Sequence, residues 1–324
     1  MLTLFGNEIS SDPLNAGLMK PRRDSPWWRI SENGWWARGF ARLTKTNEMC
    51  FSFDIRTEQI EKFHQTYQIH DKGRKPMDKS VAVVTGGTRG IGLRIAERLV
   101  QRGYSLAVTY LNDEKSAEKA QQHLTRLRKK DQQILTLKGD GGDAERVAEH
   151  HRSIVKKLGP ITVLVNNAGT MPVRSFEEIA VKDWDETIRV NLNSAFYWCR
   201  QVVPGMKEMK FGRIVNLSSV AARGGGVIGP HYAASKAGML GLTRYAAREL
   251  GPFGITVNAI APAFIVDAGV FTEWPEEKKA SLKDKIFVPR LGTSDDVARA
   301  FEYLLDSPFV TGVTLDVNGG AFMI

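Results

Sequence analysis

The chain has 324 residues, 42% of them hydrophobic, and a formal net charge of +9. This composition is typical of a globular protein, and the length is sufficient for one large α/β domain and an appendage. No apolar run reaches the roughly 18–20 residues that span a bilayer, and the basic residues are interspersed with acids, so we expect neither a membrane span nor nucleic-acid binding. The two cysteines stand in no metal or redox spacing, which predicts no metal site and fits a reducing cytoplasm.

The first 76 residues lack the alternation of strand-like and helix-like patterns seen later in the chain. They hold four of the seven tryptophans, as Trp27-Trp28 and Trp35-Trp36. These aromatic side chains could dock on the main domain, on a membrane surface or on a partner. The alternative is a poorly ordered extension, or sequence translated upstream of a true start at Met77. We expect the poorly ordered extension over 1–76, followed by a single domain over 77–324.

From residue 77 onward, strand-like runs rich in β-branched residues alternate with amphipathic stretches of helical periodicity. The strand-like runs are 81–84, 105–111, 134–137, 161–165, 213–217, 255–260 and 313–317. The helical stretches lie near 91–102, 114–129, 143–158, 182–209, 231–250 and 294–306. Such alternation predicts right-handed crossovers and a parallel sheet with helices on both faces. Seven strands of this kind indicate a Rossmann-type doubly wound α/β fold, whose ligand crevice lies at the carboxyl ends of the strands.

A glycine-rich turn joins the first of these strands to the first helix. It reads Thr85-Gly-Gly-Thr-Arg-Gly-Ile-Gly92. Glycines let backbone N–H groups approach a pyrophosphate, and the positive end of the following helix stabilises its charge. Because a strand precedes the turn and a helix follows it, the sequence predicts a dinucleotide-binding loop. Its contact residues are Gly86, Thr88, Arg89, Gly90, Ile91 and Gly92.

The end of the second strand favours NADP over NAD. NAD-binding domains of this type place a carboxylate there, which accepts from the ribose 2′-hydroxyl and repels a 2′-phosphate. This strand instead ends in Thr109-Tyr-Leu-Asn112, without an acid, and Arg89 in the loop can pair with a phosphate. Asp113 and Glu114 follow closely, and we interpret them as acids at the start of the next helix.

A tyrosine and a lysine stand four residues apart in His231-Tyr-Ala-Ala-Ser-Lys236. On a helix this spacing places Tyr232 and Lys236 one turn apart on the same face. A neighbouring ammonium favours the phenolate, so we expect a lowered pKa for Tyr232 and a phenol that exchanges protons near neutrality. The pair Ser218-Ser219 ends thirteen positions upstream of Tyr232. Beside a dinucleotide loop, this set indicates hydride transfer to a carbonyl or from an alcohol.

Seven motifs in one order make the chain resemble the classical short-chain dehydrogenase/reductase family over nearly all of residues 77–324. They are Thr85–Gly92, Asn166-Asn-Ala-Gly169, Asn191-Leu192, Ser218-Ser219, Tyr232 with Lys236, Ile255-Thr-Val-Asn258 and Val317-Asn-Gly-Gly320. Within the family the chain is most similar to bacterial 3-oxoacyl-(acyl-carrier-protein) reductases and acetoacetyl-CoA reductases. That similarity rests on the nucleotide loop, the segment 289–292 and the C-terminal Asn-Gly-Gly-Ala-Phe-Met-Ile324.

The resemblance implies a role for each matched residue. Tyr232 would exchange a proton with the substrate oxygen, and Ser219 would hold that oxygen. Lys236 would bond the nicotinamide ribose and keep the pKa of Tyr232 down, while Asn191 would position a water that links Lys236 to solvent. The other implied cofactor contacts are Asn112 on the second strand, Asp140 with Gly141 at the adenine, Asn166, Ala168 and Gly169 along the adenosine ribose, and Ile265 at the carboxamide.

The chain departs from the family pattern near the substrate. Asp267 stands close to where the family often has a threonine that contacts the carboxamide. It either accepts from that amide or caps the following helix, and we expect the cap. Phe253 replaces an arginine that the carrier-protein reductases use to dock their acidic partner, whereas Lys210 keeps a positive charge. The segment 271–285 matches the substrate lid of the family, where aromatic side chains either cover an acyl chain or belong to a solvated surface.

The expected activity is NADP(H)-dependent reduction of a ketone to a secondary alcohol, with a 3-oxoacyl thioester of CoA or acyl carrier protein as the substrate. A dehydrogenase for a sugar, a polyol or a small free carbonyl compound is an alternative. A nucleotide-sensing protein without turnover is a third hypothesis, which the intact set of Asn191, Ser219, Tyr232 and Lys236 disfavours. The resemblance further implies a homotetramer.

Overall fold

The computed structural model describes residues 38–43, 49–54 and 80–323. The chain separates into two units, Met1–Lys75 and Pro76–Ile324. Within the first unit, the described residues form two antiparallel strands, β1 (Arg38–Leu43) and β2 (Met49–Asp54). This strand pair differs from the expectation of an extension without regular structure. Both tryptophan pairs and the rest of 1–76 lie outside the described residues, so the assignment of this segment stays a prediction.

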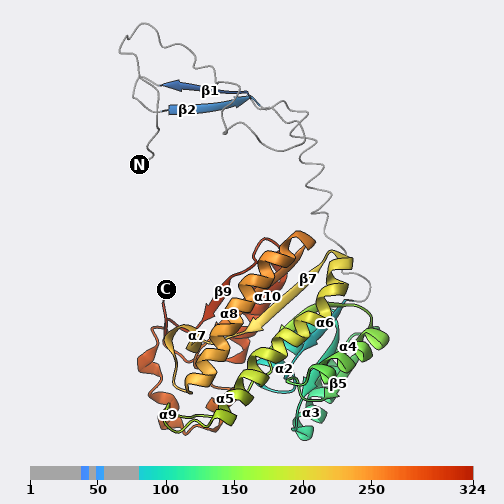
Figure 1. Ribbon diagram of the computed structural model, residues 1–324, viewed down its shortest axis with the longest axis vertical. Coiled ribbons are helices and arrows are strands. Elements are labelled where there is room, and N and C mark those ends of the chain that lie inside the picture. Colours follow the sequence, from blue (N-terminus) through green and yellow to red (C-terminus); the bar gives the residue numbers. More distant parts are fainter. Residues whose placement is uncertain (1–37, 44–48, 55–79, 324) are drawn as a thin grey trace. The chain divides into compact units, whose positions relative to one another are not determined.

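The second unit is built on one sheet of seven parallel strands in the order β5-β4-β3-β6-β7-β8-β9 (Figure 1). The strands are β3 (Val81–Val84), β4 (Ser105–Tyr110), β5 (Ile134–Lys138), β6 (Ile161–Asn166), β7 (Gly212–Leu217), β8 (Ile255–Pro262) and β9 (Thr314–Val317). Central strands such as β3 are fully buried, which is why they read as continuous apolar runs. The predicted doubly wound α/β fold is confirmed.

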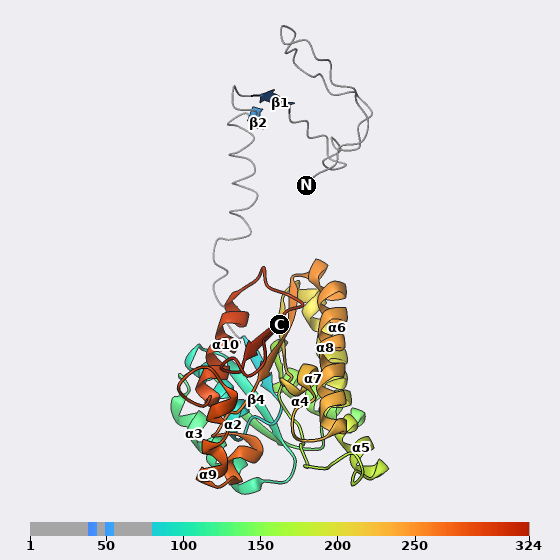
Figure 2. The ribbon, with the colours of Figure 1, turned by 90° about the vertical axis from the view of Figure 1, so that its left-hand side faces the viewer.

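Helices cover both faces of this sheet (Figure 2). The helices of one layer are α2 (Gly90–Gln101), α3 (Glu114–Leu127) and α10 (Ser294–Asp306), and those of the other are α4 (Ala144–Leu158), α6 (Ser194–Met209) and α8 (Pro230–Leu250). Each layer has its own core: Ile95, Leu99 and Phe301 are fully buried in the first, and Ile154 and Met206 in the second. The sheet therefore lies between two apolar cores.

The helical stretch expected over 182–209 is not one continuous helix. It consists of α5 (Val181–Ile188), a five-residue π-helix η2 (Arg189–Asn193), and α6. A π-helix inserts an extra residue into the helical register and is frequent at functional sites. The fully buried Asn191 lies within η2, where its Oδ1 accepts from the Thr170 N–H at 2.7 Å and its Nδ2 donates to the Thr170 carbonyl at 2.9 Å. These bonds to the segment after β6 accompany the break in register.

Shorter elements complete the second unit. They are α7 (Ala221–Gly224), α9 (Glu276–Ala280) and three 3₁₀-helices, η3 (Gly251–Phe253), η4 (Gly269–Glu273) and η5 (Lys283–Lys285). All of them except η3, which leads into the start of β8, follow the carboxyl ends of strands. The strand order reverses between β3 and β6, and in open parallel sheets the ligand crevice lies at that point. Among the described residues, no helix is long and apolar enough to cross a membrane.

Candidate active site

The glycine-rich loop between β3 and α2 has no room for side chains at its key positions. A Cβ atom at Gly92 would collide with the carbonyl oxygen of Gly86, and one at Gly86, whose φ is +61°, would lie 3.0 Å from the Cα of Ala168. Gly90 also takes a positive φ of +52°, a conformation that favours glycine. The N-cap residue Arg89 makes no side-chain cap bond, so the first N–H groups of α2 are open to an anion. This cradle fits the pyrophosphate of a dinucleotide.

Two consecutive asparagines after β6 serve different purposes. The Nδ2 of Asn167 donates to the carbonyls of Thr85 and Gly86 at 2.9 and 3.0 Å, which ties the loop to β6. Asn166 turns into the interior instead. It is 3% exposed, and its Nδ2 donates to Asn216 Oδ1 at 2.8 Å. Its side chain therefore cannot line the adenosine ribose as expected, which leaves only its backbone for that role. The N–H of Ala168 is likewise bonded, to Thr85 Oγ1 at 2.9 Å.

The predicted adenine contact, Asp140, is held by an arginine that the sequence did not single out. Its Oδ1 accepts from the Gly142 N–H at 2.8 Å, and its Oδ2 pairs with Arg189 Nη1 at 2.8 Å. Arg189 also bonds both carboxylate oxygens of Glu186 at 2.8 Å. A Cβ at Gly142 would clash with the guanidinium of Arg189, whereas a Cβ at Gly141 would only reach ordinary contact with Ser194. The η2 π-helix thus supports the predicted adenine end of the site.

Arg89 and the acids after β4 lie together at the surface. The side chain of Arg89 is 79% exposed, and its Nη1 is 3.9 Å from Asp113 Oδ2. Asp113 is the N-cap of α3, where it accepts from the Ser116 N–H at 3.0 Å, and Glu114 lies in the first turn. The bonds with Ser116 are the main cause of the lowered pKa of Asp113, and Arg89 lowers it further. The interpretation of both acids as helix-start residues is confirmed; Asn112 beside them is exposed.

Tyr232, Lys236 and Ser219 come together at the carboxyl end of β7. Tyr232 and Lys236 lie one turn apart near the start of α8, where they are 8% and 4% exposed. The side chain of Tyr232 hydrogen-bonds with that of Ser219, which lies in the turn between β7 and α7. The Nζ of Lys236 donates to the Leu217 carbonyl at 2.7 Å and lies 5.7 Å from the centre of the Tyr232 ring. Helical spacing and the end of one strand therefore assemble this group.

The expected lowering of the Tyr232 pKa is wrong for this arrangement. Burial raises the pKa of Tyr232, and the hydrogen bond with Ser219 offsets only part of that rise. Burial also lowers the pKa of Lys236 to about 8. The ammonium of Lys236 is bonded to the Leu217 carbonyl. For Tyr232 and Lys236 alike, the cost of removing the charged form from water has the largest effect on the pKa. Tyr232 is consequently protonated at neutral pH, the form that donates a proton to a substrate oxygen.

Asn191 and Gly169 border this group on the side of β6. Besides its bonds to Thr170, Asn191 donates from Nδ2 to Ser235 Oγ at 3.1 Å. A Cβ at Gly169 would lie 3.2 Å from Asn191 Oδ1 and 3.7 Å from Lys236 Nζ, so this glycine sits beside the predicted catalytic pair. Ser235 is a contact that sequence reasoning missed, although its place immediately before Lys236 was a signal.

Apolar side chains surround the Tyr232 ring and extend towards the lid segment. Ala221 and Ile228 pack with Tyr232, and Met171 lies against this cluster. The loop that carries Met171 is fastened by His231, whose Nε2 lies 3.1 Å from the Pro172 carbonyl oxygen. His231 is fully buried and is a second residue that the sequence analysis left without a role.

Three aromatic rings line up at the start of the lid segment. The centre of the Phe271 ring is 6.1 Å from that of Phe264 and 4.9 Å from that of Trp274. Lys278 places its Nζ 3.8 Å from the centre of the Trp274 ring. The cluster has an apolar side, as a cover for an acyl chain requires, and a cationic edge, as a solvated surface has.

Asp267 is not a free acceptor, because its carboxylate is bonded at the start of a distant helix. Its Oδ1 accepts from the N–H and the hydroxyl of Ser294 at 2.8 and 3.0 Å, at the start of α10. The expectation that Asp267 caps the following helix is therefore wrong: it bonds Ser294, the first residue of α10, whose N-cap is Thr293. Ile265, two residues earlier, is 3% exposed and pairs with Gly292 in an isolated parallel bridge. No group of three or more His, Cys, Asp or Glu side chains suited to a metal occurs among the described residues.

Comparison with known proteins identifies the class to which this site belongs. The family model described as short chain dehydrogenase matches residues 80–279. The chain belongs to the short-chain dehydrogenase family, whose members use a nicotinamide cofactor, and is an oxidoreductase acting on CH–OH groups.

Several curated relatives cover the same part of the chain. It is 37% identical over 249 residues to a 3-oxoacyl-(acyl-carrier-protein) reductase of Staphylococcus aureus, which spans 76% of this chain and 99% of the relative. The corresponding reductase of Staphylococcus epidermidis is 35% identical over 76% of this chain and 100% of its own length. An acetoacetyl-CoA reductase of Shinella zoogloeoides is 36% identical over 75% of this chain and 99% of its own length.

Proposed function

We propose that this protein reduces a 3-oxoacyl thioester to the corresponding 3-hydroxyacyl thioester with NADPH. One observation above all supports the proposal: a buried, protonated Tyr232 is bonded to Ser219 one turn from Lys236, in a chain 35–37% identical to reductases of two kinds of acyl thioester. The bound cofactor would supply the hydride. The proton and the stabilisation of charge come from the chain itself.

In the proposed reaction, negative charge gathers on the carbonyl oxygen as the carbonyl carbon accepts the hydride. Ser219 and Tyr232 hold that oxygen, and Tyr232 transfers its proton to it, so that the products are an alcohol and a tyrosinate. Lys236, with a pKa of about 8, is protonated at neutral pH and can return a proton to Tyr232. Asn191, fixed by Thr170 and Ser235, lies beside this pair where a water can link it to solvent.

Preference for NADPH is supported by the residues around the loop after β4. No acid ends that strand, Asp113 is committed to capping α3, and the exposed guanidinium of Arg89 is available to a phosphate. We also propose a homotetramer in the cytoplasm. The exposed aromatic side chains of Phe196, Tyr245 and Tyr303, on α6, α8 and α10, support assembly through these helices.

A paired assay tests the activity. The assay measures kcat/KM with NADPH and, separately, with NADH. The substrates are acetoacetyl-CoA, acetoacetyl carrier protein, ethyl acetoacetate and a panel of sugars and polyols. We expect the highest kcat/KM with NADPH and a thioester. Faster turnover of a free ketone or a polyol would favour the alternative dehydrogenase, and tight cofactor binding without turnover of any substrate would favour the nucleotide sensor. Comparison of the two thioesters identifies the carrier.

A further inference from the structure

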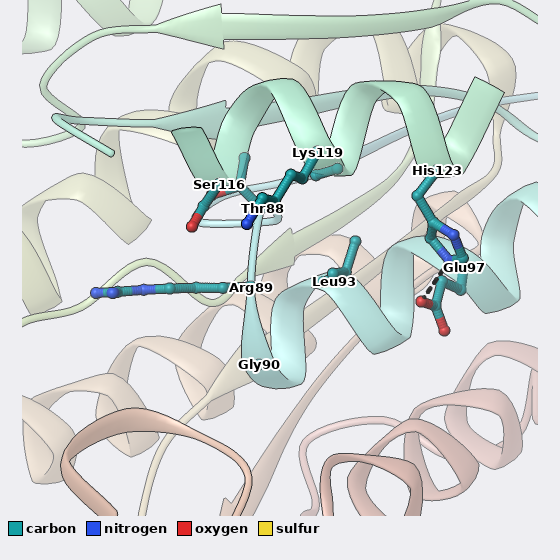
Figure 3. A pocket seen from close by; sticks show the side chains of 9 residues that line it. Thr88, Arg89, Gly90, Leu93, Glu97, Ser116, Lys119 and His123 are labelled. Atoms are coloured by element: carbon teal, nitrogen blue, oxygen red, sulfur yellow. Dashed lines mark hydrogen bonds and ion pairs between the residues drawn. The ribbon is translucent and has the colours of Figure 1, made fainter. Parts of the chain in front are cut away.

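A cleft of about 460 Å³ opens between α2 and α3 beside the nucleotide loop (Figure 3). Thr88 and Arg89 contribute to its wall from the loop, and Ser116 and Lys119 from α3. Figure 3 shows these four side chains at the end of the cleft where α2 begins, and the pair of Glu97 and His123 at the other end. The cleft therefore starts where the carboxyl end of β4 meets the loop, the place at which this fold holds the adenosine ribose.

The two ends of the cleft differ in their charge. At the far end, Glu97 is bonded by Arg94 Nη1 at 2.6 Å and by His123 Nε2 at 2.8 Å, so its carboxylate is already satisfied. At the loop end, Arg89 and Lys119 both act on the carboxylate of Asp113 and lower its pKa, after the larger effect of the Ser116 bonds. Arg89 Nη1 remains 3.9 Å from that carboxylate, and Lys119 has no salt bridge within the described part of the chain.

Two cations thus stand against one acid at the loop end, which leaves a net charge of +2 − 1 = +1. Without Lys119 the balance would be zero, and the negative charge of Asp113 would oppose the attraction of Arg89 for a phosphate. Ser116 and Lys119 are three residues apart on α3 and share one helix face, so a hydroxyl and an ammonium point to the same side of the cleft. A phosphate monoester, which carries between one and two negative charges at neutral pH, matches this set.

We infer that Lys119 and Ser116 form the second half of a 2′-phosphate subsite whose first half is Arg89. The inference rests on the proposed use of NADPH and adds the residues that make the preference possible despite Asp113. In this subsite Arg89 binds the phosphate from the loop side and Lys119 from the side of α3. In the free protein the hydroxyl of Ser116 bonds the Asp113 carboxylate; when the phosphate binds, this hydroxyl donates to a third phosphate oxygen instead, while the Ser116 N–H keeps its bond to Asp113.

The test measures binding of 2′,5′-ADP and of 5′-AMP by calorimetry, without any turnover. The variants are Lys119→Gln and Ser116→Ala, with Lys115→Gln as the matched control, because Lys115 is exposed on the same helix but does not line the cleft. We expect Lys119→Gln to weaken 2′,5′-ADP binding about five- to tenfold and Ser116→Ala about threefold, with 5′-AMP binding within about twofold of wild type. Raising the salt concentration should reduce the loss, because ions screen exposed charges.

Arg89→Gln separates the inference from the proposal on which it depends. If Arg89→Gln weakens 2′,5′-ADP binding while Lys119→Gln does not, the NADPH preference stands and the role of Lys119 is overturned. Equal losses from Lys119→Gln and Lys115→Gln, or equal losses for both nucleotides, also overturn that role. A wild-type protein that binds 5′-AMP as tightly as 2′,5′-ADP would overturn the NADPH preference itself, and the subsite with it.

Discussion

Replacement of Lys236 by methionine should change how stability depends on pH. Burial lowers the pKa of Lys236 from 10.5 to about 8, so between these values the unfolded chain binds a proton that the folded protein releases. The free energy of unfolding of the wild type therefore rises with pH across this window. A methionine does not titrate, and the variant lacks this rise.

The magnitude follows from the size of the shift. A difference of 10.5 − 8 = 2.5 pKa units corresponds to about 3 kcal/mol, of which about 2.5 kcal/mol is recovered between pH 7 and pH 10. At pH 7 the variant escapes the cost of burying the ammonium, but it leaves the Leu217 carbonyl without its bond to Nζ, a loss of about 1–3 kcal/mol. We therefore expect similar stabilities at pH 7 and a wild type more stable by about 2 kcal/mol at pH 10.

Urea unfolding at pH 7, 8, 9 and 10, at one protein concentration, gives the difference between wild type and Lys236→Met at each pH. The raised pKa of Tyr232 has the opposite effect on stability, but only above pH 10, and the comparison cancels it. Lys115→Met is the control, because an exposed lysine should give a difference that does not vary with pH. If the difference in free energy of unfolding between wild type and Lys236→Met also stays constant with pH, the amine of Lys236 titrates normally in the wild type, and the reasoning is refuted.

Three further substitutions test other parts of the site. Tyr232→Phe removes the proton donor, so turnover should fall by at least about a hundredfold while the Kd for NADPH stays within about twofold; an equal loss of both would contradict the assigned role. Gly92→Ala places a methyl group against the Gly86 carbonyl oxygen, so calorimetry should show weaker nucleotide binding, and unchanged affinity would argue against the glycine cradle. Asp267→Ala removes the acceptor for Ser294, and urea unfolding should show a loss of about 1 kcal/mol that Asp267→Asn partly restores; a variant as stable as wild type would contradict a stabilising role for this bond.

Much of the fold could be predicted because a strand buried on both faces has a local signature. Val81–Val84 is apolar and β-branched throughout and is fully buried, so composition alone locates it. The break in the helical stretch at Arg189–Asn193 has no such signature, since no glycine or proline lies within it. It accompanies bonds between Asn191 and the backbone of Thr170, 21 residues earlier, and only the folded structure brings these together.

The candidate site divides in the same way. A spacing of four places Tyr232 and Lys236 on one helix face, and helical geometry guarantees that arrangement. Spacing does not say how deeply a pair is buried, and burial reverses the expected direction of the Tyr232 pKa. The ion pair of Arg189 with Asp140 joins two separate elements, so no local pattern could have predicted it.

The π-helix η2 carries residues that contact both ends of the candidate site. Arg189 at its start braces the carboxylate of Asp140, and Asn191, two residues later, anchors the segment beside Lys236. A disturbance of this single turn would reach the predicted adenine contact and the proposed proton route at once. Variants that unwind η2 should therefore lose nucleotide affinity and catalytic rate in parallel, whereas damage to either end alone would affect one of them.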